Sequence, residues 1–445
     1  MTDQTTIEPQ MENGETPPAP MMPPRRSLAY LIGALAGGNL LDKVFRLIGG
    51  LLQTRYILPE ALGAFNGIGL VLGFGRFLQL GVMNGLNREL PYYFGRKDVA
   101  RVHELAAAAQ AWALILGATL AVPFAGVGVW HLLRGDWAMA VGWGSNSLLA
   151  LIFFYVTMYL PATYRTASDF ARLATANVIQ SAVALALVAT IALWGFYGLC
   201  LRATIPALIG LWILRRWQPI DVRPKWSLRH LRHLLIVGLP IFAVGELGGS
   251  LWVLVDQRLV QHYLDDRGLG LYYLVVVVGS TVELLPQSVS QVLYPRMAEH
   301  YGRTHDLWAI IVMNIRPTLL LVASMLPVVV LGWWLARPLT KLLLPPNWVD
   351  AVPAAQWSLL PALALSFCCV FNVYNVVKRQ DLYGIVILLS FAGYFGTLMW
   401  LIRNGPSLVA FPQAMLVGRI VYAVAGFGFL IPTWLQHRND MVVKS

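Results

Sequence analysis

Long apolar runs recur along nearly the whole chain and are separated by short polar stretches. An α-helix needs roughly 20 mostly apolar residues to cross the hydrocarbon core of a bilayer, and many of these runs reach that length. The pattern predicts an all-α polytopic membrane protein with about twelve transmembrane helices. The predicted spans cover residues 28–52, 63–88, 105–130, 143–163, 174–196, 198–215, 234–257, 269–294, 308–335, 352–377, 383–402 and 410–435.

The ends of the chain and the stretch between the sixth and seventh spans differ from the rest. Residues 1–24 are rich in Pro, Thr and Glu and have no apolar run, so we expect a disordered cytoplasmic tail and not a signal peptide. The expected organisation then continues with an N-terminal six-helix lobe (25–217), a basic cytoplasmic linker (218–233), a C-terminal six-helix lobe (234–436) and a second cytoplasmic tail (437–445).

Composition and charge placement support a membrane protein and indicate its orientation. Hydrophobic residues make up 57% of the chain and charged residues 12%, whereas a soluble domain carries about 25% charged residues. The net charge of +11 would suggest nucleic acid for a soluble protein. Here most Lys and Arg residues outside the spans fall on the side of the N-terminus, most densely from Arg215 to His233. The positive-inside rule therefore predicts a multi-pass protein with both termini cytoplasmic, whose basic segment anchors the topology or binds anionic lipid head groups or an acidic partner.

The two halves of the sequence contain related short segments. LGAF at 62–65 corresponds to LGLY at 269–272, and YFGR at 93–96 corresponds to HYGR at 300–303, both at an offset of 207 residues. Six spans per unit return the chain to its starting side, so the repeats are expected to be parallel. Two such bundles that face each other leave a cleft between them, which is the plan of an alternating-access transporter.

Four basic residues within the predicted spans are candidates for binding an anion: Lys43, Arg46, Arg76 and Arg419. Ionisable residues are costly inside a membrane and usually face a wet cavity or a partner. A guanidinium group also forms bidentate hydrogen bonds with phosphate oxygens. The alternative is internal pairing, as Asp42 and Arg46 are four residues apart on one helix.

The sequence leaves two alternative roles for the acidic residues of the spans. Glu246, Asp256 and Glu283, together with Asp42, could bind a proton or a sodium ion and couple its gradient to transport, or they could balance the arginines. The sequence shows no metal-ligand spacing and no nucleophile–base pair, so we expect no catalytic residue, no metal and no cofactor.

Two segments near the N-terminus resemble a known family. RYILPEALGAF at 55–65 and GVMNGLNRELPYY at 81–93 resemble signatures of polysaccharide-biosynthesis (O-antigen or exopolysaccharide) flippases of the multidrug/oligosaccharidyl-lipid/polysaccharide exporter (MOP) superfamily. The resemblance implies a V-shaped pair of lobes. It also implies an undecaprenyl-pyrophosphate-linked oligosaccharide as substrate, moved from the cytoplasmic to the periplasmic leaflet. Lys43, Arg46 and Arg76 occupy places comparable to those of basic residues in lipid II flippases, which are thought to hold the pyrophosphate.

The resemblance also narrows the class of polysaccharide and the partners. We see no extra pair of spans after the twelfth, as lipid II flippases have, which favours O-antigen, exopolysaccharide or capsule synthesis over peptidoglycan export. The expected partners are the lipid-linked substrate, membrane lipids and other polysaccharide-assembly proteins, and not nucleic acid.

Three other classes of membrane protein fit the sequence less well. A multidrug extrusion antiporter of the same superfamily would bind cationic drugs, which the basic first half disfavours. A membrane-embedded polysaccharide polymerase or ligase usually has a sizeable outer loop, and the outer segments here are short. A channel or scaffold would normally show a filter-like repeat. A non-enzymatic transporter is the expected function.

Overall fold

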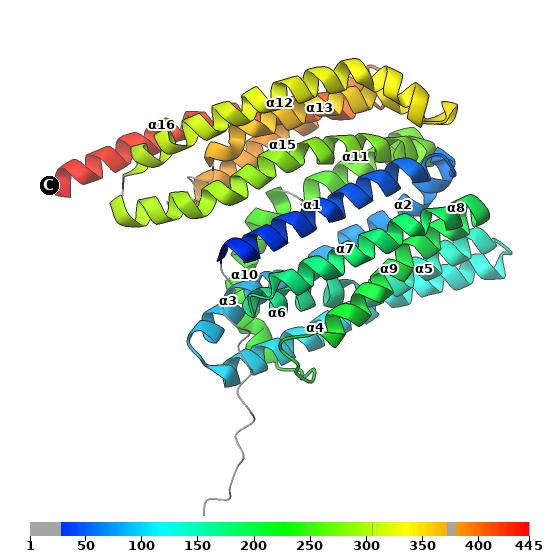
Figure 1. Ribbon diagram of the computed structural model, residues 1–445, viewed down its shortest axis with the longest axis horizontal. Helices are drawn as coiled ribbons and strands as arrows, with labels where there is room; N and C mark the ends of the chain where they lie inside the picture. The colour runs from blue at the N-terminus through cyan, green and yellow to red at the C-terminus, as the bar shows by residue number, and fades with distance from the viewer. Residues whose placement is uncertain (1–27, 249, 305, 372–379, 445) are drawn as a thin grey trace, which may run out of the picture.

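A computed structural model of the chain describes residues 28–248, 250–304, 306–371 and 380–444. The predicted N-terminal tail, 1–24, lies outside these residues. The described part is α-helical and contains no β-strand. Its helices form two bundles that approach each other at one end and spread at the other, where α1 begins and α16 ends (Figure 1). The expected V-shaped pair of helical lobes is confirmed.

The first bundle follows the six spans predicted for the first half, although several spans are built from more than one helix. Its helices are α1 (Leu28–Gln53), α2 (Pro59–Gly75), η1 (Arg76–Gln79), α3 (Val82–Gly95), α4 (Val99–Leu133), α5 (Trp137–Phe154), η2 (Tyr155–Tyr159), α6 (Leu160–Thr166), α7 (Phe170–Ala186), α8 (Val188–Trp194) and α9 (Phe196–Arg216). The second span breaks between η1 and α3, where Leu80 and Gly81 both have positive φ.

Three helices of the first bundle begin at an aspartate that caps them. Asp98, Asp136 and Asp169 each accept a hydrogen bond from the backbone N–H three residues later, at the starts of α4, α5 and α7. A carboxylate at this position satisfies one of the backbone donors that a helix start leaves unpaired. These local signals fix where three of the long apolar helices begin.

The second half forms α10 (Leu228–Gly248), α11 (Ser250–Thr304), α12 (Leu307–Leu343), η3 (Pro346–Ala351), α13 (Val352–Phe367), η4 (Cys368–Phe371), α15 (Gln380–Arg403) and α16 (Ala410–Lys444). Since α16 continues to Lys444, residues 437–444 extend this helix instead of forming a separate tail.

The long element α11 is a helical hairpin and not one straight helix. Asp265 has φ 58° and ψ −166°, which is outside the helical region. The Tyr272 hydroxyl donates a hydrogen bond to Asp256, sixteen residues earlier, whereas a straight helix would place these residues about 24 Å apart at 1.5 Å per residue. The Asp265 carboxylate accepts hydrogen bonds from the N–H groups of Arg267 (2.8 Å) and Gly268 (3.2 Å), which caps the second leg. The predicted break between spans seven and eight is therefore present.

Nine helical segments within the described residues are long and apolar enough to cross a membrane, and one of these covers both legs of α11. The helices α1, α10 and α13 are not among these nine, and they lie at the predicted first, seventh and tenth spans. The seventh span then consists of α10 from Leu234 onward and the first leg of α11 (250–264), and the second leg (266–304) contains the eighth.

Candidate functional site

A cleft lies between α1 of the first bundle and the second leg of α11. Its volume is about 410 Å³. The residues that line it are Leu40, Lys43, Val44, Arg46, Leu47, Tyr273, Val277, Ser280, Thr281, Leu284 and Leu285. On both helices these positions are separated mainly by three, four or seven residues, the spacing that places side chains on one helical face. The cleft is thus a mostly apolar groove whose charge comes from α1 and whose hydroxyl groups come from α11.

Arg46 is oriented by an acidic neighbour one turn earlier. Its Nε donates to both carboxylate oxygens of Asp42, at 2.9 and 3.0 Å. The Asp42 side chain is largely buried, whereas 57% of the Arg46 side chain is exposed. Because Asp42 engages Nε, the two Nη nitrogens can still form a bidentate pair with an anion. Lys43 is exposed on the same cleft, so the Asp42–Lys43–Arg46 group carries a net positive charge.

The opposite wall presents three hydroxyl groups. Ser280 and Thr281 donate to the backbone carbonyl of Val277, at 3.2 and 2.7 Å, and each hydroxyl oxygen can still accept a hydrogen bond. Tyr273 reaches α1, where a Cβ atom placed on Gly50 would lie 2.8 Å from the tyrosine oxygen. The absence of a side chain at Gly50 therefore lets the two bundles touch at this point.

The two other predicted anion-binding residues do not line the cleft. Arg76 is half-buried at the start of η1. Arg419 on α16 lies 3.5 Å from the Glu283 carboxylate and 5.6 Å from the centre of the Trp252 ring, inside the second bundle. Of the four predicted cations, the structure brings together Lys43 and Arg46.

The predicted acids occupy different surroundings. Asp256 is buried in the second bundle, where it accepts hydrogen bonds from Tyr272 and Tyr394. It is not held by the nearby Arg258, which donates to Gln261 at 2.8 Å. Glu283 pairs with Arg419, and Asp42 with Arg46. Glu246 belongs to α10, and its side chain lies outside the described residues.

Tyr273 and Thr281 were not among the residues predicted from the sequence. The signal for them was the spacing of 273, 277, 280, 281 and 284, which repeats on one face of the eighth span. Tyrosine and threonine in an apolar run resemble ordinary core residues, so their position on the cleft becomes visible only when α1 is placed beside them.

The two bundles contact each other at the end opposite the start of α1. Arg267 lies 3.5 Å from Glu60 across the bundles, and the Trp348 indole N–H donates to the Ile57 carbonyl at 3.3 Å. Apolar residues of both bundles form one buried cluster beside these contacts. We call Glu60, Arg267, Ile57 and Trp348 the outer tie. It closes the cleft region at one end.

Comparisons with known protein families and with curated proteins show what this chain is similar to. The model of a polysaccharide biosynthesis protein family matches residues 147–353. A short match links the chain to sulfate adenylyltransferase subunit 2 from Geotalea daltonii, with 34% identity over 125 residues, 26% of this chain and 40% of the relative. The chain thus spans well under two thirds of that curated relative, and this match carries no argument about the whole protein.

The solved structures agree over nearly the full length. An inward-facing multidrug resistance MATE family transporter of the MOP superfamily has a TM-score of 0.72 at 15% identity and covers 92% of this chain and 99% of its own. An outward-facing structure of such a transporter has a TM-score of 0.62 at 16% identity, over 93% and 98%. A MOP superfamily transporter from Pyrococcus furiosus has a TM-score of 0.62 at 15% identity, over 92% and 96%. This chain is therefore a multi-pass membrane protein with the fold of these MOP superfamily transporters, and the match of residues 147–353 to the polysaccharide biosynthesis family supports the resemblance stated from the sequence.

Proposed function

We propose that the protein is a flippase that moves an undecaprenyl-pyrophosphate-linked oligosaccharide from the cytoplasmic to the periplasmic leaflet of the bacterial inner membrane. The product would serve O-antigen, exopolysaccharide or capsule synthesis. The observation that supports this most directly is the cleft between the bundles, which combines Lys43 and Arg46 with mostly apolar walls.

The chemistry of the cleft favours an amphipathic anion. Lys43 and the Nη edge of Arg46 suit phosphate oxygens, since guanidinium and ammonium groups form charge-assisted hydrogen bonds with them. Leu40, Val44 and Leu284 offer an apolar surface beside these cations, where an isoprenoid chain would be removed from water. A cationic drug would be repelled by the same two side chains, so multidrug extrusion is the weaker candidate.

The position of the cleft favours alternating access over an open pore. The walls come from different bundles, and the outer tie joins the bundles at one end. In our proposal both termini are cytoplasmic, so the spread end faces the cytoplasm and receives the substrate. Release on the other side then requires the outer tie to part.

The buried carboxylate of Asp256 is our candidate for energy coupling. It has no positively charged partner among its hydrogen bonds, which come from two tyrosine hydroxyls. A carboxylate in an apolar bundle is costly to charge unless a proton, a metal cation or a donor compensates it. We therefore propose that a proton or sodium gradient acts through Asp256, with no resident cofactor and no catalytic group in the protein. Other polysaccharide-assembly proteins are the proposed partners.

A flipping assay in proteoliposomes tests the proposal. Geranylgeranyl pyrophosphate with a nitrobenzoxadiazole label would be followed by dithionite quenching of the outer leaflet. The double variant Lys43→Gln/Arg46→Gln should reduce flipping to the protein-free rate. Arg134→Gln is the matched control, because Arg134 stacks on Trp130 at 3.7 Å and is not part of the cleft. Unchanged flipping by the double variant would refute the role of the cleft, and ethidium efflux by the wild-type protein would favour a multidrug extruder.

A further inference from the structure

The helix α10 opens the second half of the sequence, yet it packs into the first bundle. Gly81 and Gly85 on one side and Gly238 of α10 on the other leave no room for a side chain, because an added Cβ would overlap the facing backbone. Leu231 and Leu234 of α10 are buried in the same apolar cluster as the first bundle's own core residues. This is the close packing of a permanent helix interface and not that of a loose contact.

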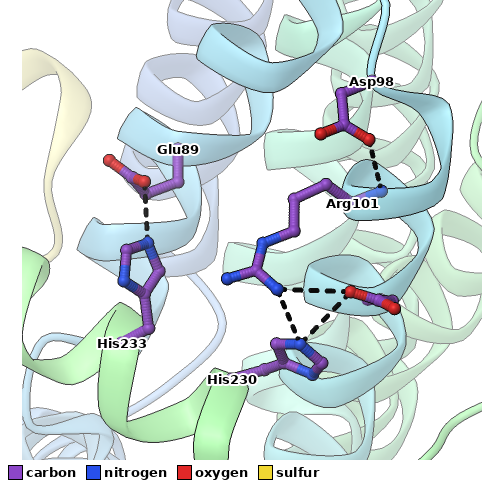
Figure 2. Close-up of polar contacts among 6 residues, drawn as sticks. Glu89, Asp98, Arg101, His230 and His233 are labelled. Atoms are coloured by element: carbon purple, nitrogen blue, oxygen red, sulfur yellow. Dashed lines mark hydrogen bonds and ion pairs between the residues drawn. The ribbon is translucent and has the colours of Figure 1, made fainter.

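Polar side chains reinforce this interface near the start of α10, as Figure 2 shows. The His233 imidazole on α10 lies 2.9 Å from the carboxylate of Glu89 on α3, whose side chain is only 11% exposed. His230, one turn earlier, lies 2.9 Å from Arg101 and 3.2 Å from Glu104, both on α4. Asp98, which caps α4, accepts from the backbone N–H of Arg101 at 3.0 Å. We call Glu89, Arg101, Glu104, His230 and His233 the α10 latch.

The segment that leads into α10 is also held by the first bundle. The backbone N–H of Lys225 donates to the carbonyl of Ala107 on α4 at 3.1 Å. The Trp226 ring lies 6.0 Å from that of Trp112, also on α4. The linker predicted at 218–233 is therefore fastened along α4 and does not behave as a free tether between the bundles.

The first leg of α11 has different neighbours, although it continues the same span. Trp252 packs on Phe391 and Tyr394 of α15, with ring centres 5.7 and 5.2 Å apart. Asp256 accepts a hydrogen bond from Tyr394. The first leg also lies against α2, with Leu254 beside Gly73 and Gln261 beside Gly67, but its buried residues Trp252 and Val260 belong to the core cluster of the second bundle. In contrast, α10 lies with the first bundle at the end where the bundles spread (Figure 1).

We propose that α10 moves with the first bundle during transport, held there by the α10 latch and the glycine contacts, and that the seventh span bends between Gly238, which packs on the first bundle, and Trp252, which packs in the second. The moving units then divide within this stretch and not in the linker at 218–233. This inference rests on the alternating-access function proposed above, but it assigns a specific helix to a specific moving body.

Two engineered crosslinks test it in a full-length chain in which Cys200, Cys368 and Cys369 are replaced by alanine. The first, Glu89→Cys/His233→Cys, joins α10 to α3. The second, Glu60→Cys/Arg267→Cys, joins the bundles at the outer tie. Each protein is treated with a short bismaleimide, or with N-ethylmaleimide, which modifies each thiol singly. Flipping of the labelled geranylgeranyl pyrophosphate is then measured in proteoliposomes.

The expected result is that the α10 crosslink leaves the flipping rate equal to that of its N-ethylmaleimide control, whereas the outer-tie crosslink abolishes flipping. Loss of flipping with both crosslinks would overturn the assignment of α10 to the first bundle while leaving alternating access intact. Full flipping with both would instead reject alternating access itself. If Glu89→Cys/His233→Cys is inactive before crosslinking, the pair Glu104→Cys/His230→Cys joins α10 to α4 of the same bundle, and the same outcomes apply.

Discussion

Gly63 and Gly270 occupy equivalent places in the two repeats, 207 positions apart, and they pack together where α2 crosses the second leg of α11. A Cβ atom added to Gly63 would lie 2.9 Å from the Gly270 nitrogen and would overlap the carbonyl of Asp266. An added Cβ on Gly270 would overlap the carbonyl of Pro59. The repeated LG segment found in the sequence is therefore the point where the two bundles meet beside the outer tie.

The first prediction concerns this crossing. Gly63→Ala should destabilise the protein by about 1–3 kcal/mol, the usual cost of inserting atoms into a tightly packed contact. Gly126→Ala is the matched control, since a Cβ on Gly126 would meet nothing within 4 Å. Thermal unfolding in detergent measures both. Equal melting temperatures for the two variants would mean that the crossing relaxes more easily than its geometry indicates.

The second prediction concerns Asp42. Replacing it with asparagine keeps an acceptor for Arg46 Nε but removes the negative charge that offsets Arg46. We expect Asp42→Asn to bind geranylgeranyl pyrophosphate more tightly, by up to about fivefold, because solvent around the exposed Arg46 side chain limits its interaction with Asp42 to about 1 kcal/mol or less. Fluorescence titrations at low and high salt measure the gain, which should shrink as salt screens the charges. An affinity that falls, or does not change at either salt concentration, contradicts the prediction.

The third prediction concerns the hydroxyl wall. If Ser280 and Thr281 accept hydrogen bonds from the sugar next to the pyrophosphate, the double variant Ser280→Ala/Thr281→Val should lose affinity only for a glycosylated lipid. Each lost hydrogen bond is worth about 0.5–1.5 kcal/mol, so the combined loss is about 5- to 150-fold. Binding of geranylgeranyl pyrophosphate with and without one attached hexose provides the comparison. Equal losses for the two lipids would show that neither hydroxyl contacts the sugar.

Much of the fold follows from the sequence, because hydropathy and span length are local properties. The twelve spans, the repeat and the position of Lys43 and Arg46 on one face of α1 are all of this kind. The sequence predicts Arg76 within one continuous second span, over residues 63–88. The left-handed residues Leu80 and Gly81 interrupt that helix, so the regular spacing does not carry through.

Other features depend on which helices become neighbours, and spacing along one helix does not contain that information. Charge alone groups Arg419 with Lys43, Arg46 and Arg76, yet its contacts are Glu283 and Trp252 in the second bundle. The packing of α10 on α3 likewise rests on long-range contacts such as Gly85 with Leu234. Hydropathy places α10 in the second half and gives no sign that it joins the first bundle.

The fourth prediction concerns energy coupling. Asp256→Asn keeps the size of the side chain and one acceptor oxygen for Tyr272 or Tyr394, but it cannot gain or lose a proton. We expect flipping without a gradient to be unchanged, and acceleration by an imposed proton or sodium gradient to disappear. Asp136→Asn is the control, because Asp136 caps α5 near the surface. Gradient-stimulated flipping by Asp256→Asn would exclude this carboxylate from coupling.

The fifth prediction concerns pH and the α10 latch. His230 lies before the predicted seventh span, and burial, together with the positive charge of Arg101, lowers its pKa below the ordinary value of 6.5. The folded protein therefore binds a proton at His230 less readily than the unfolded chain does. Stability rises with pH wherever the unfolded state binds more protons than the folded state. At pH values well above 6.5, His230 should therefore not lower the free energy of unfolding. Below that value its contribution should become destabilising as the pH falls toward the lowered pKa.

Thermal unfolding of the detergent-solubilised protein between about pH 5 and 8 measures this effect, over a window that brackets the ordinary histidine pKa. His230→Gln, which retains a hydrogen-bonding group for Arg101 but does not titrate, should melt with a smaller drop toward acid than the wild-type protein. Glu104→Gln should steepen the drop, because the Glu104 carboxylate is the group that raises the pKa of His230 against the effect of Arg101. Identical pH profiles for the wild-type protein and both variants would show that the latch does not respond to protonation of His230.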